Sequence, residues 1–134
     1  MDNYDLYNTV QRIPGLKHNY IGSFPADRIP QNFPNNKICI INTDDSSSEG
    51  THWLMLAKKG GKFYFADSFG NSIKKYPQIR LKFKPRQLIS KQLQNENICG
   101  LYAIYFASKL FNGNKPNFEY VRDFDIIKYF CSYL

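Results

Sequence analysis

The chain lacks several features that would place it in a familiar class. It has only three cysteines and two histidines among 134 residues, so we expect neither a disulfide framework nor a zinc site. No apolar run approaches the ~20 residues that span a bilayer. The N-terminus does not have the basic-then-apolar pattern of a signal peptide. We therefore expect an intracellular protein that is not secreted, has no membrane partner and uses no cofactor or metal ion.

Acidic residues are missing from residues 68–95, although the chain as a whole carries eleven of them and a net charge of +7. This stretch contains seven basic residues. Such a run forms either a solvated surface or a contact for a polyanion such as DNA, and both interpretations stay open. The candidate DNA-binding residues are Lys74, Lys75, Arg80, Lys82, Lys84 and Arg86, with Lys91 completing the run.

The length and the 43% hydrophobic content favour one folded domain over residues 1–134. Apolar spacing predicts a helix over residues 5–13, followed by a proline-punctuated loop. Short apolar runs predict buried strands at 38–42, 53–57 and 62–66, the last two joined by a hairpin turn. Alternating apolar and basic residues predict a further strand at 79–84.

A nearly uninterrupted apolar stretch over residues 99–111 predicts a helix in the middle of the domain, and the aromatic tail predicts one or two short helices. The order of elements indicates an α+β fold, in which a small, mostly antiparallel sheet packs against a buried central helix.

Cys99 stands where a polar loop meets this central helix. A helix start presents unpaired backbone N–H groups and a positive dipole end, which lower the pKa of a thiol and stabilise an oxyanion. The same two features would activate a nucleophilic cysteine. Cys39 lies in an apolar strand and Cys131 in the aromatic tail, so we expect both to be buried and unreactive.

A nucleophilic cysteine needs a base, and His52 opens a predicted strand. Asp67 closes the next strand, and the hairpin between them has equal arms, so both side chains should lie at its open end. An imidazole with a carboxylate beside it is the base and orienting group of a catalytic triad. Together, His52, Asp67 and Cys99 predict a cysteine hydrolase, in the first place a protease.

Several blocks of sequence occur in an order that resembles the adenovirus maturation protease (adenain) family, including its relatives in virophages and Polinton-type elements. That family belongs to the same clan as the SUMO-specific cysteine proteases. The blocks are YIGSF (20–24), RIP (28–30), ICIINT (38–43), GTHWLM (50–55), FYFADSFG (63–70) and CGLY (99–102).

The resemblance implies the fold of that clan, with Cys99 as nucleophile, His52 as general base and Asp67 as the orienting acid. It implies that Trp53 packs beside the histidine and that Gly100 follows the nucleophile in the family's Cys-Gly pair. It also implies a glutamine in the oxyanion hole a few residues before the cysteine. Gln92 fits the adenovirus-like spacing and Gln94 is the alternative, with the Cys99 amide as the second donor.

The resemblance further implies a monomeric viral endopeptidase that cleaves capsid or core precursor proteins at glycine-containing sites during virion maturation. It would act in the virion and in the infected cell, in the nucleus or a cytoplasmic virus factory, with DNA as an activator. Two alternatives stay open. One is an isopeptidase that removes ubiquitin or SUMO-like proteins, and the other is a basic DNA-binding module without catalysis.

Overall fold

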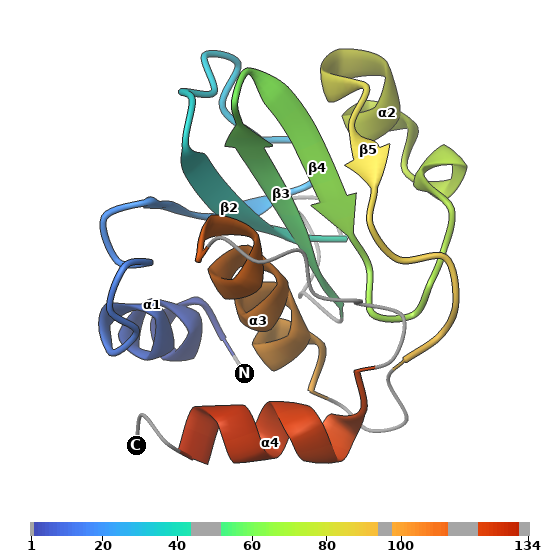
Figure 1. Ribbon diagram of the computed structural model, residues 1–134. Coiled ribbons are helices and arrows are strands. Elements are labelled where there is room, and N and C mark those ends of the chain that lie inside the picture. The colour runs from blue at the N-terminus through green and yellow to red at the C-terminus, as the bar shows by residue number, and fades with distance from the viewer. Residues whose placement is uncertain (1, 44–51, 94–97, 113–120, 132–134) are drawn as a thin grey trace.

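The computed structural model describes residues 2–43, 52–93, 98–112 and 121–131. The elements along the chain are α1 (Asn3–Gln11), β1 (Tyr20–Pro25), β2 (Lys37–Asn42), β3 (Trp53–Lys59), β4 (Lys62–Ala66), the short 3-10 helix η1 (Ile73–Lys75), α2 (Pro77–Phe83), β5 (Arg86–Gln87), α3 (Cys99–Phe111) and α4 (Asp123–Cys131). They form the α+β arrangement expected from the sequence (Figure 1).

One five-stranded sheet has the order β1-β2-β3-β4-β5. Its centre is antiparallel, because β3 pairs antiparallel with both β2 and β4. Each edge is parallel, since β1 runs parallel to β2 and β5 runs parallel to β4. The β3–β4 hairpin therefore brings the start of β3 and the end of β4 to the same end of the sheet.

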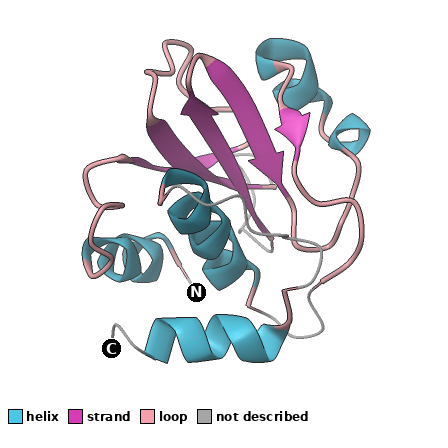
Figure 2. Ribbon diagram, in the orientation of Figure 1, coloured by secondary structure: helices cyan, strands magenta, loops and turns pink. Residues whose placement is uncertain are grey.

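Both faces of the sheet are covered (Figure 2). Along β2 and β3, Ile40 and Met55 face a core shared with α1, α3 and α4, whereas Ile41 and Leu54 face a second core shared with α2. Neighbouring side chains on a strand point to opposite faces, so these two strands are apolar at nearly every position. Their continuous apolar runs in the sequence follow from this two-sided burial.

Helix α3 is the buried helix that the sequence predicts. It contacts β3, β2, α1 and α4, and Tyr102, Phe106 and Ala107 are completely buried in its middle. The helix ends at the Asn112 cap. Among the described residues, no helix is both long enough and apolar enough to span a bilayer.

Residues 79–84 are not a strand, and the prediction made for them is wrong. Residues 77–83 form α2, with Pro77 in its first turn, where proline fits a helix well. Ile79 and Phe83, four residues apart, are buried on one helix face, whereas Leu81 is 65% exposed. The alternation along the sequence fits a strand equally well, and packing onto the sheet selects the helix.

The loop predicted after the first helix contains a strand, β1, that the sequence analysis missed. Its six residues are all only partly buried, and its register with β2 shifts between Tyr20 and Gly22. Neither a period of two nor a continuous apolar run marks such a strand in a sequence. Its pairing with β2 is a tertiary interaction.

Candidate active site

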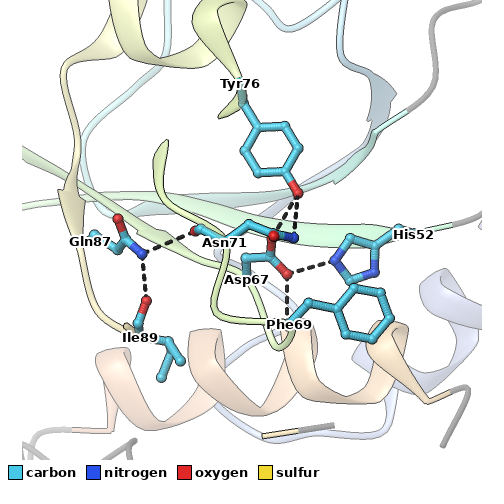
Figure 3. Close-up of polar contacts among 7 residues, drawn as sticks. All are labelled: His52, Asp67, Phe69, Asn71, Tyr76, Gln87 and Ile89. Carbon is cyan, nitrogen blue, oxygen red and sulfur yellow. Dashed lines mark hydrogen bonds and ion pairs between the residues drawn. The ribbon is translucent and has the colours of Figure 1, made fainter. Parts of the chain in front are cut away.

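His52 and Asp67 meet at the open end of the β3–β4 hairpin. His52 directly precedes β3 and Asp67 directly follows β4. His52 Nε2 lies 2.6 Å from Asp67 Oδ1, in a hydrogen bond and ion pair (Figure 3). Asp67 is completely buried and His52 is 7% exposed. The structure thus brings together the two side chains that the hairpin spacing paired, and their catalytic roles remain a prediction.

The Asp67 carboxylate has hydrogen-bond donors on both oxygens. Besides His52, Oδ1 accepts a hydrogen bond from the backbone N–H of Phe69 at 2.8 Å. Oδ2 accepts from the Asn71 amide at 3.0 Å and from the Tyr76 hydroxyl at 2.7 Å. Burial disfavours the charged carboxylate, but these bonds, led by those of His52 and Tyr76, outweigh it and lower the pKa of Asp67.

The ring of Phe69 covers one side of the imidazole. Its centroid lies 4.0 Å from that of His52, with 7° between the planes. The Phe69 amide binds Asp67 while its ring stacks on His52, so one residue of the turn contacts both partners of the ion pair. This contact restricts the imidazole to the plane in which Nε2 faces the carboxylate.

Cys99 is the first residue of α3 and is 4% exposed. Burial alone would raise the pKa of its thiol, but interactions with the His52 side chain and with the backbone of Trp53 and Gly100 outweigh burial, and the thiol pKa is lowered. The N-cap residue, Ile98, makes no side-chain capping bond. Residues 94–97, which precede Ile98, lie outside the described residues.

The imidazole carries a matching shift. Burial lowers the pKa of His52, but the hydrogen bond to Asp67 and the interaction with Cys99 raise it, with a net value of about 9. The other ring nitrogen, Nδ1, is buried and forms no hydrogen bond within the described part of the chain. The two shifts favour the charged form of each group, the imidazolium of His52 and the thiolate of Cys99.

Gln92 lies on an exposed segment beside the turn that carries Asp67. The next residue, Leu93, donates its N–H to the Ser68 carbonyl at 2.9 Å. Its carbonyl oxygen accepts a hydrogen bond from the Tyr102 hydroxyl at 3.3 Å. The segment is thus tied both to the Asp67 turn and to the first turn of α3. Gln94, the alternative oxyanion donor, lies outside the described residues.

The remaining predicted residues fall in two groups. Trp53 follows His52 and Gly100 follows Cys99 in the chain. Both are buried, and their backbones interact with Cys99. The basic residues expected to contact DNA are all exposed, on η1, on α2, just after α2 and on β5. They are Lys74, Lys75, Arg80, Lys82, Lys84 and Arg86.

The two other cysteines differ from each other. Cys39 is buried in β2 as expected, and burial raises the pKa of its thiol. Cys131 is exposed at the end of α4, so the prediction that it is buried is wrong. It falls on the outer face of α4, whose inner face buries Ile126 and Phe130.

Sequence reasoning missed the second set of contacts around Asp67. Asn71 belongs to the turn and Tyr76 precedes α2, and the sequence around them shows only basic charge and an alternation of apolar and basic residues. No motif marks either residue, because their contact with Asp67 depends on how the chain returns from the turn to α2. Phe69 lies inside the quoted FYFADSFG block, so its position next to the site was the one available signal.

Comparison with known proteins finds a similarity in structure and none in sequence. No protein-family model matches the chain, and no curated protein sequence matches it. Among solved structures, the fold is similar to the crystal structure of the selenomethionine form of the ASFV pS273R protease, with a TM-score of 0.50 and 19% identity. The match covers 73% of this chain and 43% of that one. The chain therefore shares a fold with a viral protease and spans less than half of its length.

Proposed function

We propose that this chain is a cysteine endopeptidase in which His52, Asp67 and Cys99 form the catalytic triad. One observation carries the proposal: a buried carboxylate, an imidazole and a thiol from three separate segments interact in that order, with the pKa of the imidazole raised and that of the thiol lowered. The fold similarity to the ASFV pS273R protease supports the same class of enzyme. It also supports the SUMO-protease-like clan more than the adenain family in particular.

The proposed reaction begins with the Cys99 thiolate attacking the carbonyl carbon of a peptide bond. The Cys99 amide and the Gln92 side chain stabilise the resulting oxyanion, and a single donor of this kind contributes on the order of 3 kcal/mol. His52 gives its proton to the leaving amine through Nδ1, because Nε2 is held by Asp67. Water then attacks the thioester, passes a proton to His52 and releases the acid and the thiolate.

The substrate class and the setting follow from the resemblance in sequence. We propose cleavage of viral capsid or core precursors at glycine-containing sites, by a monomeric enzyme in the virion and the infected cell, with DNA as an activator. The exposed basic residues from Lys74 to Arg86 support a polyanion contact. An isopeptidase acting on ubiquitin-like proteins would use the same triad, so the substrate panel must separate the two activities.

The decisive test compares the wild-type chain with Cys99→Ala and with Cys131→Ala, the latter a matched control at the exposed thiol. The substrates are peptides with Gly-Gly and Gly-X-Gly sites and a ubiquitin-like fusion that ends in the same diglycine. We expect Cys99→Ala to lower peptide cleavage by on the order of a thousandfold or more and Cys131→Ala to leave it unchanged. Cleavage that survives Cys99→Ala contradicts the proposal, and preference for the fusion favours the isopeptidase.

A further inference from the structure

The described polar contacts continue beyond the triad, on the side of Asp67 that faces away from His52. Each carboxylate oxygen accepts two hydrogen bonds, and the bond to His52 uses only one of these four. Oδ2 is occupied entirely by Asn71 and Tyr76, which also contact each other at 3.3 Å. Figure 3 shows both side chains converging on this oxygen.

A carboxylate held only at Oδ1 can rotate about its own axis, and rotation would turn Oδ1 away from Nε2. Two donors on Oδ2 prevent that rotation, because any turn of the carboxylate breaks both bonds. They also stabilise the charged form of a group that is completely buried. We propose that Tyr76 and Asn71 are positioning residues that hold Asp67 charged and oriented toward His52, an inference that rests on the proposed triad.

Tyr76 is well suited to this task because its hydroxyl stays protonated. Burial and the neighbouring Asp67 carboxylate raise the pKa of Tyr76. The phenol therefore stays protonated, and remains a hydrogen-bond donor, over the pH range of the proposed activity. The Tyr76 ring packs against Phe65 on β4, with 5.7 Å between the two ring centroids. Among the residues that the structure describes, His52 and Tyr76 are the titratable groups with the largest direct effect on Asp67, and Cys99 acts on His52.

Asn71 is held by its own support. Gln87 on β5 donates its side-chain amide to the Asn71 carbonyl at 3.0 Å and to the Ile89 carbonyl at 2.6 Å. The Gln87 side-chain oxygen accepts the Ile73 N–H at 3.2 Å. The turn after Asp67 and the start of η1 are thus fixed to strand β5, and this fixes the direction from which Asn71 reaches Oδ2.

The test measures how the reactivity of Cys99 depends on pH, and therefore needs no substrate. Iodoacetamide alkylation is followed between about pH 5 and pH 10 in a Cys131→Ser background, with Tyr76→Phe, Asn71→Ser and the double variant. Tyr64→Phe is the matched control, because it removes the same atom from a half-buried tyrosine on β4. Thermal unfolding is recorded for each variant.

If Asp67 is released, His52 is less stable as a cation and the Cys99 thiolate loses its partner. We expect Tyr76→Phe to slow alkylation at pH 6 by about five- to tenfold, since a hydrogen bond to a charged group is involved, and to leave the rate at pH 10 unchanged. Peptide cleavage should change in the same way. In a plot of kcat/KM against pH, the acid limb should move to higher pH and the alkaline limb to lower pH. Tyr64→Phe should change neither profile.

An unchanged pH profile in Tyr76→Phe, Asn71→Ser and the double variant overturns the inference, and a lower melting temperature with an unchanged profile assigns these residues a structural role only. Failure of the proposed function looks different. In that case Cys99 of the Cys131→Ser parent would alkylate with the pH dependence of an ordinary thiol. The contrast between parent and variant therefore tests the inference, and the parent alone tests the triad.

Discussion

At the scale of single residues, the proposed reaction depends on two opposite pKa shifts, one in His52 and one in Cys99. The pKa of His52 is raised to about 9 by Asp67 and Cys99, against the effect of burial, and that of Cys99 is lowered by His52 and by backbone groups, also against burial. Each group stabilises the charged form of the other. Together they define a window of pH in which the ion pair exists.

The window predicts the pH dependence of the proposed activity. The kcat/KM value should rise as pH rises through the lowered thiol pKa, stay level, and fall as pH passes about 9, where His52 loses its proton. Asp67→Asn removes the carboxylate that supports the imidazolium, so the alkaline limb should move to lower pH. Initial rates of peptide cleavage at low substrate measure both limbs. A wild-type alkaline limb near the ordinary histidine pKa would contradict the raised pKa of His52 and therefore the ion pair with Cys99.

Gly70 occupies a position that suits only glycine. It has a φ of +69° and lies against the backbone of Lys91 and Gln92. A Cβ atom there would come within 2.4 Å of the Lys91 carbonyl carbon and 2.7 Å of the Gln92 nitrogen. Backbone atoms cannot rotate away as a side chain can. The glycine therefore allows the Asp67 turn and the Gln92 segment to pack together.

We expect Gly70→Ala to lower the free energy of unfolding by roughly 2–5 kcal/mol, from overpacking and left-handed strain together, and to reduce kcat by displacing Gln92. Gly60→Ala is the matched control, with a φ of +59° and no atom within 4 Å of the added carbon. It should lower the free energy of unfolding by about 1–2 kcal/mol, because an alanine is strained at a positive φ, and leave kcat unchanged. Denaturant unfolding and peptide cleavage provide the measurements. Equal losses of kcat in the two variants would contradict the role of this contact.

At the scale of elements, α2 shows how one sequence pattern fits two structures. Residues 79–84 alternate between apolar and basic side chains, which predicts a strand, yet the buried pair is Ile79 and Phe83. Their spacing of four is the helical one. The helix closes the second core, where Phe83 lies 5.1 Å from Phe63 on β4.

The helix predicts unequal effects at two positions that the strand would make equivalent. Ile79→Ala should destabilise the chain by about 2–5 kcal/mol, because a completely buried side chain leaves a cavity. Leu81→Ala should change stability by less than about 0.5 kcal/mol, because Leu81 is 65% exposed. Chemical denaturation monitored by circular dichroism measures both. Similar losses of stability in the two variants would contradict the helix and favour a strand over residues 79–84.

At the scale of the whole molecule, charge is distributed unevenly. The six candidate DNA-binding residues are exposed, and none of them forms an ion pair with a carboxylate within the described ranges. Lys82 is partly engaged, since its ammonium donates to the Ile29 carbonyl at 2.9 Å. An excess of uncompensated positive charge on η1, α2 and β5 is what a polyanion contact requires.

We expect double-stranded DNA to bind with an affinity that falls steeply with salt, with a slope of about −0.9 per phosphate contact. Lys74→Gln, Lys75→Gln and Arg80→Gln combined should reduce that slope by about 2 to 3. The control combines Lys17→Gln, Lys62→Gln and Lys128→Gln, which removes the same charge from exposed positions elsewhere. Fluorescence anisotropy at several salt concentrations gives the slopes. If the salt slope changes equally in the two triple variants, the attraction comes from net charge alone and the proposed contact surface is contradicted.

The sequence by itself determined the parts of this protein that depend on local pattern. The strands of the central hairpin follow from their apolar runs and the turn between them, and the central helix follows from its long apolar stretch with Cys99 at its start. The convergence of His52 and Asp67 could also be predicted, because a hairpin with equal arms returns its two ends to one place.

Only the tertiary structure decided what depends on contacts between distant segments. Strand β1 exists through its pairing with β2. Residues 77–83 are helical because they cover the sheet, and Cys131 is exposed because α4 buries its other face. The approach of Tyr76 and Asn71 to Asp67 is of the same kind. Local sequence sets the period and the turns, whereas the choice of partner depends on which surfaces are buried together, and a single sequence carries no direct record of that choice.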